Sequence, residues 1–194
     1  MLSTTDAIVL SLQPHSDKAH VLHAYTRAYG RVNYMVYGMG RKNTSGRYTP
    51  LSLLQLTTDN RSIRTAQLSF VPRTIDTDPY KRTIVLFISE VLYHVLRHPM
   101  ADEPMYDYIS EAVQALDATD KPQNFHLLFL VGLASRLGFA IDSTNPLSLI
   151  TEGVLPLTRE ERQKQLRALC NYFAEHVETW QEPKSLEILM EVFD

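Results

Sequence analysis

The residues best placed to do chemistry in this sequence are basic and surround the stretch YGRVNYMVYGMGRK, which runs from Tyr29 to Lys42. The stretch begins with the alternation of a β-strand and ends in a loop where glycines precede Arg41 and Lys42. Arg31 and Arg47 lie before and after that loop. Positive side chains on a flexible loop can bind phosphates through charge, without reading base sequence. The spacing therefore indicates a nucleic-acid surface rather than a reaction centre.

The alternation in this strand also assigns its side chains to two faces. One face holds Val32, Tyr34 and Val36, and the other holds Asn33, Met35 and Tyr37. If the first set is interior, Tyr37 faces solvent and can stack on a base, which is worth about 1–3 kcal/mol. In the opposite orientation the stacking is lost and the loop charges remain. Arg27 and Arg64, at the ends of neighbouring strands, would extend the basic group.

Other sites of chemistry lack support in the sequence. The GMGRK segment has neither the spacing nor the Ser/Thr of a phosphate-binding P-loop. His94 and His98 are four apart in an expected helix, but no third metal ligand accompanies them. Cys170 is the only cysteine, and a small buried apolar role suits it. We therefore predict no catalytic residue, no metal site and no cofactor, although an unrecognised enzyme stays an open alternative.

Charge is distributed unevenly along the 194 residues. The net charge of −3 argues against a nucleic-acid binder as a whole. Residues 1–78, however, hold nine Lys/Arg and five acidic residues, whereas the remainder holds ten Lys/Arg and seventeen acidic residues. Such asymmetry predicts a basic working module joined to an acidic one.

The hydrophobic period changes at the same place. Five short alternating segments occupy about the first seventy residues and predict a small barrel or sandwich, of which a barrel leaves fewer exposed edges. From Asp78 the period is helical, with Asp78 as N-cap and Pro79 in the first turn. The TREE segment from Thr158 fits a capping box. The prediction is an α+β chain, with a five-stranded barrel over 1–77 and an all-α region over 78–194.

The helical region has one strongly apolar segment and one irregular one. The segment from Phe125 to Leu137 is apolar nearly all round and should form the centre of a bundle. Residues 138–156 contain helix-breaking residues and are expected to form a loop. The N-terminus lacks the basic region of a signal peptide, and the apolar segments are too short to cross a membrane. A cytoplasmic, nucleoid-associated location without membrane contact is expected.

Several stretches resemble a known family in the same order along the chain. The stretch SDKAHVLHAYTRAYGRVNYMVYGMGRK resembles the N-terminal signature of the RecO recombination mediators. The stretches YTPLSLLQL and IRTAQLSF resemble its next two strands. LFISEVLYHVLRH and LEILMEVF are similar to the family's first long helix and C-terminal segment.

The resemblance implies a fold, an activity and partners. It implies an OB-fold joined to a helical domain, binding of single- and double-stranded DNA, and annealing of complementary strands. It also implies loading of recombinase onto strands coated by single-strand-binding protein, together with RecR, so that contact with RecA is indirect. The family's basic surface would fall on Arg31, Arg41, Lys42 and Arg47, with Arg27 and Arg64 less directly placed. Many members carry a four-cysteine zinc module, which this chain's single cysteine does not match.

Two interpretations from different classes therefore stand beside one another. The first is a non-catalytic DNA repair mediator with a basic barrel. The alternative is a protein-interaction adaptor whose small barrel binds a peptide and has no role on DNA. Salt-dependent binding of single-stranded DNA would separate them, because phosphate contacts weaken as salt rises.

Overall fold

The computed structural model describes residues 2–38, 45–156 and 158–192. Its first part is a closed five-stranded barrel made of β1 (Leu2–Ser16), β2 (Ala19–Thr26), β3 (Gly30–Tyr37), β4 (Leu53–Asp59) and β5 (Ser62–Leu68). The strand order is β1-β2-β3-β5-β4, and β1 pairs with β4 to close the barrel. All pairings are antiparallel except that of β3 with β5. The five-stranded barrel expected from the alternating pattern is confirmed.

The barrel has an interior core formed by alternate residues of its strands. That core comprises Ala7, Val9, Leu22, Ala24, Tyr34, Val36, Tyr48, Leu54, Leu56 and Ala66. On β1 and β2 the outward-facing side chains are also buried, including Ile8, Leu10 and Tyr25. These three pack in the core of the helical region rather than in the barrel interior. One outer face of the barrel is therefore covered by helices.

The helical region contains six helices among the residues that the structure describes. They are α1 (Pro79–Val95), α2 (Glu103–Ala118), α3 (Phe125–Arg136), α4 (Ser148–Thr151), α5 (Arg159–His176) and α6 (Leu186–Val192). Asp78 caps α1 by accepting from the N–H groups of Tyr80 and Lys81, and Thr158 forms the predicted capping box with Glu161. Both predicted helix starts are confirmed because these side chains satisfy otherwise unpaired N–H groups.

Two local expectations were wrong. Helix α1 ends at Val95, so His98 lies outside the helix and does not form an i,i+4 pair with His94. His98 precedes Pro99, and the proline ring disfavours helical backbone at the residue before it. The segment expected to be a loop over 138–156 contains the single helical turn α4.

The connection between barrel and helices is fastened to the end of α2 by Asp117. The Asp117 carboxylate accepts hydrogen bonds from the backbone N–H groups of Arg73, Thr74 and Ile75 at 2.8–3.0 Å. The Lys81 ammonium donates to the Thr74 hydroxyl at 2.7 Å and to the Asp117 carbonyl at 2.9 Å. Asp117 and Lys81 are both buried. The crossing from one region to the other is thus a fixed structure with satisfied polar groups.

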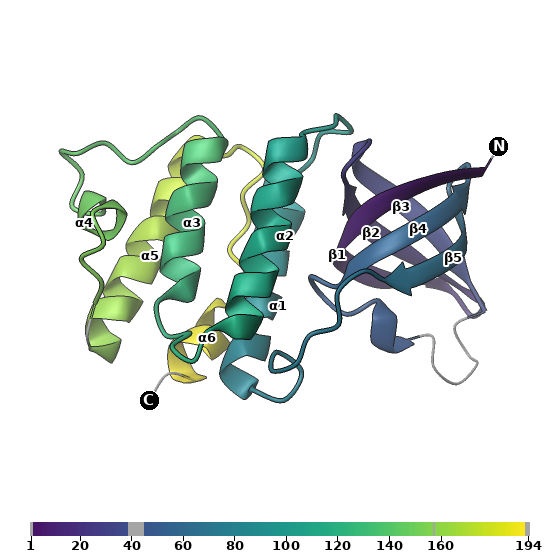
Figure 1. Ribbon diagram of the computed structural model, residues 1–194. Helices are drawn as coiled ribbons and strands as arrows, with labels where there is room; N and C mark the ends of the chain where they lie inside the picture. Colours follow the sequence, from purple (N-terminus) through teal and green to yellow (C-terminus); the bar gives the residue numbers. More distant parts are fainter. Residues whose placement is uncertain (1, 39–44, 157, 193–194) are drawn as a thin grey trace.

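Figure 1 shows the barrel and the helices side by side, with α1 and α2 nearest to the barrel. One continuous hydrophobic core includes Ile8 and Leu53 of the barrel together with Phe87 and Ile109 of the helices. The two regions are therefore packed as one body. The division at residues 77 and 78 stays a prediction.

Candidate nucleic-acid interface

Strand β3 carries the residues from which the site was predicted. Tyr34 and Val36 are buried in the barrel, and Val32 packs against the same core. The orientation with these three side chains inward is therefore confirmed. Tyr37, on the opposite face, has 62% of its surface exposed at the end of the strand. An exposed tyrosine ring of this kind is available for stacking.

A lysine that the sequence analysis did not select lies beside Tyr37. Tyr37 pairs with Ala19 across the β2–β3 ladder, and the N–H of Gly38 donates to the Lys18 carbonyl at 3.2 Å. Lys18 is exposed, so its ammonium is at the same end of the barrel as the Tyr37 ring. The signal for Lys18 was the hairpin register, because a short turn before Ala19 brings residue 18 alongside the end of β3.

Arg47 and Arg64 are associated with β5, which pairs in parallel with β3 at Met35 and Ser62 and so runs toward the end that holds Tyr37. Arg47 closes the short 3-10 helix η1 (Ser45–Arg47), and its guanidinium donates to the Ala66 carbonyl of β5 at 2.5 Å. Arg64 is exposed on β5 and forms an ion pair with Asp59 at 3.0 Å. Because the ion pair is open to solvent, it is weak and can be exchanged for a phosphate. Arg41 and Lys42, the loop residues predicted to bind DNA, lie outside the described residues.

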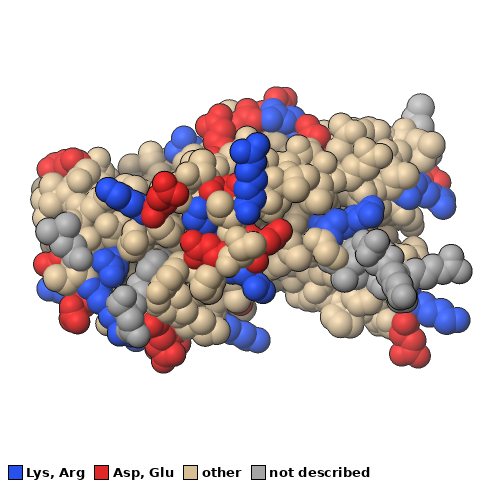
Figure 2. Space-filling model, turned by 60° about the horizontal axis from the view of Figure 1, so that its bottom comes forward, with Lys and Arg blue, Asp and Glu red and all other residues tan. Residues whose placement is uncertain are grey.

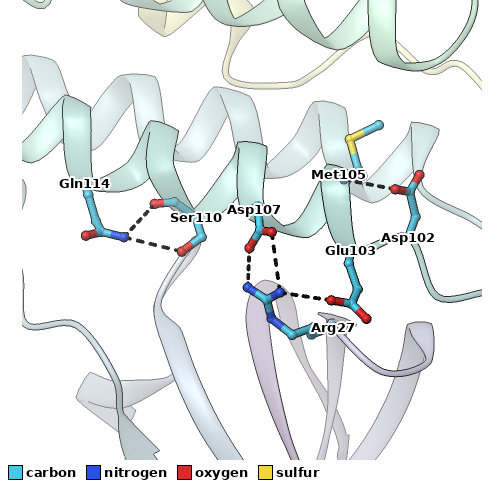
Figure 3. A network of polar contacts seen from close by, with 7 residues as sticks. All are labelled: Arg27, Asp102, Glu103, Met105, Asp107, Ser110 and Gln114. Atoms are coloured by element: carbon cyan, nitrogen blue, oxygen red, sulfur yellow. Dashed lines mark hydrogen bonds and ion pairs between the residues drawn. The ribbon is translucent and has the colours of Figure 1, made fainter.

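Arg27 lies at the opposite end of β3, where it contacts helix α2. Its guanidinium donates to the carboxylate of Asp107 and, at 3.4 Å, to that of Glu103 (Figure 3). It also stacks over the Tyr106 ring at 4.7 Å. The hydrogen bond to Asp107 raises the pKa of Arg27 above its already high value. Two carboxylates of α2 thus pair with the Arg27 guanidinium, which the sequence analysis predicted to bind DNA.

Arg31 packs on the C-terminal end of α1. Its guanidinium donates to the carbonyls of Tyr93 and Leu96 at 3.3 and 3.4 Å and lies 4.4 Å from the centre of the Tyr93 ring. Burial lowers the pKa of Arg31 to about 10, which leaves the side chain charged near neutral pH. The structure therefore separates the predicted residues into a junction group, Arg27 and Arg31, and a distal group, Tyr37, Arg47 and Arg64.

The distribution of surface charge differs between the barrel and the helical region. In the view of Figure 2, Lys and Arg predominate on the barrel half, whereas basic and acidic side chains are interspersed over the helical half. The exposed basic residues of the described barrel include Lys18, Arg61 and Arg64. Such a surface attracts polyanions and is sensitive to salt.

Comparison of the sequence with known families identifies the chain. The family model described as "Recombination protein O N terminal" matches residues 1–72, which contain the whole barrel. The model described as "Recombination protein O C terminal" matches residues 76–148. The chain belongs to the RecO family. RecO proteins serve in DNA repair and recombination as mediators rather than as enzymes.

The sequences of curated RecO relatives align with most or all of this chain. The "DNA repair protein RecO" of Christiangramia forsetii is 26% identical over 238 residues, covering 100% of both chains. That of Flavobacterium johnsoniae is 28% identical and covers 97% of this chain and 98% of its own. That of Porphyromonas gingivalis is 32% identical over 154 residues, which are 73% of this chain and 63% of the relative.

Metal ligands and reactive thiols do not gather in the part of this RecO chain that the structure describes. No group of three or more His, Cys, Asp or Glu residues there could hold a metal ion. Cys170 is buried, as predicted, and burial raises the pKa of its thiol to about 12. Within the same described ranges, no helix is long and apolar enough to span a bilayer.

One sizeable cavity lies between the barrel and α1. It has a volume of about 590 Å³ and is lined mainly by apolar residues such as Leu53, Phe70, Ile75 and Leu86. None of the predicted DNA-binding residues that the structure describes lines it. The cavity and the basic surface of this RecO chain are therefore separate features.

Proposed function

We propose that this chain is a recombination mediator that binds single- and double-stranded DNA on its barrel, anneals complementary strands and helps to load recombinase onto coated single strands. The observation that carries this proposal is the distal end of the barrel, where an exposed tyrosine lies beside exposed basic side chains. Tyr37 supplies an aromatic surface, and Lys18 and Arg64 supply positive charge. Stacking combined with charge is how sequence-tolerant binders hold single strands.

Annealing follows from charge neutralisation. Two complementary strands repel each other through their phosphates, and the repulsion opposes the first contacts between bases. A basic surface that neutralises phosphates on both strands lowers this repulsion. Contacts limited to the backbone leave the base edges free to pair, so a mediator gains by contacting phosphates rather than bases.

The proposed partners follow from membership of the RecO family. We propose RecR and single-strand-binding protein as direct partners and RecA as an indirect one, in the cytoplasm near the nucleoid. The acidic helical region provides a surface of opposite character to the barrel, which suits contacts with proteins rather than with DNA.

The test is binding of fluorescent single-stranded DNA at several salt concentrations. The variant Arg41→Ala with Lys42→Ala should lower affinity for unrelated sequences alike. The slope of log K against log salt should flatten by about 0.7 for each lost phosphate contact. The matched control is Lys121→Ala with Lys184→Ala, which removes two exposed charges from the helical region. The control should bind DNA as the unaltered protein does.

Two results would overturn parts of the proposal. If the unaltered protein bound DNA weakly and without salt dependence, the peptide-binding adaptor would be the better reading. If binding were salt-dependent but the loop variant kept the full slope, the DNA surface would lie elsewhere. Strand annealing of complementary oligonucleotides, with and without single-strand-binding protein, then tests the mediator activity itself, and we expect acceleration in both conditions.

A further inference from the structure

A cluster of two arginines around one tyrosine lies where the barrel meets the end of α1. Arg31 and Arg97 place their guanidinium carbons 4.4 and 5.4 Å from the centre of the Tyr93 ring. We call these three residues the junction cluster. Both distances are within the range of cation–π attraction, so the ring holds two positive groups near each other.

The main chain fixes this arrangement. The Arg31 N–H donates to the His98 carbonyl at 3.1 Å, which ties the start of β3 to the segment after α1. Gly30 has a φ of 62°, and a Cβ there would lie 2.2 Å from the Met100 carbonyl oxygen. Only glycine allows the two segments to approach so closely. Arg97 is therefore held beside Arg31 by backbone contacts.

The positive charge of the junction cluster has no carboxylate beside it in the described part of the chain. Within the ranges that the structure describes, neither Arg31 nor Arg97 forms an ion pair with a carboxylate. Arg97, two residues after the end of α1, is exposed and donates hydrogen bonds to His94, to the carbonyl at 3.2 Å and to the ring Nδ1 at 3.3 Å. Two like charges that share one ring without a counter-ion favour a bound anion, since an anion would relieve their repulsion.

The junction cluster also lies in line with the distal end of the barrel. Arg31, Asn33, Met35 and Tyr37 occupy the outer face of β3, because Tyr34 and Val36 face inward. Tyr37 is six positions after Arg31, which corresponds to about 20 Å along a strand. Between them the ring nitrogen Nδ1 of His23 and the Oδ1 of Asn33 form a hydrogen bond of 2.7 Å. The outer face of β3 is thus partly exposed between its two ends, with this polar pair nearer the junction and Met35 nearer Tyr37.

We propose that the junction cluster binds a backbone phosphate of a single-stranded nucleic acid whose other end is held at Tyr37. The inference rests on the function proposed above and assigns a second anchor to that function. A strand held at both ends lies along the outer face of β3 in one direction. Arg97 is the residue that gives this anchor its accessible donors, and Tyr93 orients its guanidinium.

The test compares Arg97→Ala with Arg82→Ala in binding a series of oligo-dT strands from about 4 to about 16 nucleotides long. Arg82 is an exposed arginine near the start of α1 and Arg97 follows the end of that helix, so each variant removes one exposed guanidinium from the same part of the chain. We expect Arg97→Ala to weaken binding of the longer strands by about tenfold. The salt slope should fall by about 0.7. The shortest strands, which cannot reach both ends, should bind as before, and Arg82→Ala should change neither quantity.

A charge-preserving variant tests the role of the guanidinium. Arg97→Lys should keep the salt slope but recover only part of the affinity, because an ammonium lacks the planar pair of donors. If the unaltered protein binds DNA but Arg97→Ala and Arg82→Ala behave alike at every length, the second anchor does not exist and the proposed function stands. If the unaltered protein does not bind single strands, the proposed function fails as well. Thermal unfolding of each variant confirms that the comparison is made on folded protein.

Discussion

The two ends of β3 use the same kinds of side chain for different purposes. At the junction, Arg27 and Arg31 contact α1 and α2 through carboxylates, carbonyls and aromatic rings. At the distal end, Tyr37 is exposed, and the exposed Arg64 pairs with the half-buried carboxylate of Asp59. The element packed against an arginine of a basic sequence motif therefore decides whether its side chain is engaged in the fold, as in Arg27 and Arg31, or left largely to solvent, as in Arg64.

The largest effect on stability is expected at Asp117, because this residue fastens the connection from the barrel to the helices. Asp117→Ala leaves three backbone N–H groups without their acceptor, and we expect a loss of about 3 kcal/mol in the free energy of unfolding. Asp120→Ala, an exposed neighbour, should stay within about 0.5 kcal/mol. Urea unfolding measures both. Equal values for the two variants would contradict a fastening role for Asp117.

Acid titration tests the same contact without a substitution. Burial by itself would raise the pKa of Asp117, but hydrogen bonds from Arg73, Thr74 and Ile75 lower it to about 2. The unfolded carboxyl titrates at its ordinary pKa of 3.8, so the unfolded state binds its proton first as pH falls. The stabilisation, about 2 kcal/mol, is complete above pH 3.8 and is lost as pH falls to about 2. Asp117→Asn should flatten this part of the stability profile.

Arg31 and Arg64 give the most direct contrast between the two ends. Arg31→Ala removes two hydrogen bonds to carbonyls and a stacked guanidinium, and it should cost about 2 kcal/mol in stability. Arg64→Ala removes an exposed ion pair and should cost less than about 0.5 kcal/mol. Thermal unfolding of the two variants side by side measures the difference. If both lost the same stability, the division into junction and distal groups would be wrong.

Tyr37 should show the reverse behaviour, with an effect on binding and none on stability. Tyr37→Ala removes an exposed ring that can stack on a base, and it should weaken single-strand binding by about 1–2 kcal/mol at an unchanged salt slope. Tyr37→Phe keeps the ring and should bind nearly as well as the unaltered protein. Fluorescence titration at two salt concentrations separates loss of stacking from loss of charge. A lower salt slope in Tyr37→Ala would contradict a role for Tyr37 that is limited to stacking.

The smallest expected effect is that of Arg64 on binding. Its half-buried partner Asp59 already offsets part of its charge, so a phosphate gains less there than at an arginine without a carboxylate partner. Arg64→Ala should reduce affinity by less than about 1 kcal/mol and lower the salt slope by no more than about 0.7. Lys121→Ala, in the helical region, serves as the control for net charge. An effect larger than that of Tyr37→Ala would make charge on β5 the main determinant of binding.

Local sequence patterns predicted those features of the fold that neighbouring residues determine, namely strand alternation and helix caps. Alternation in β3 placed Tyr34 and Val36 inside the barrel, and the caps at Asp78 and Thr158 marked two helix starts. The environment of Arg31 could not be predicted this way, because Tyr93 is 62 residues further along the chain. Its contact depends on how α1 packs on the barrel, and no spacing rule reports that packing. The same reason explains why Lys18 was missed, since its place beside Tyr37 depends on strand register.

The continuous core of Ile8, Leu10 and Tyr25 with α1 has a mechanical consequence. If the barrel holds DNA as proposed, a force on that DNA acts on the barrel, and a barrel on a flexible tether would turn independently of the helices. Here the barrel has buried side chains on its helix-facing side, and Asp117 locks its connection to α2. Force applied to a strand on β3 would be transmitted to the helices as a displacement of the whole body. A partner bound to the helical region would thus move the barrel, and any DNA held on it, together with the helices.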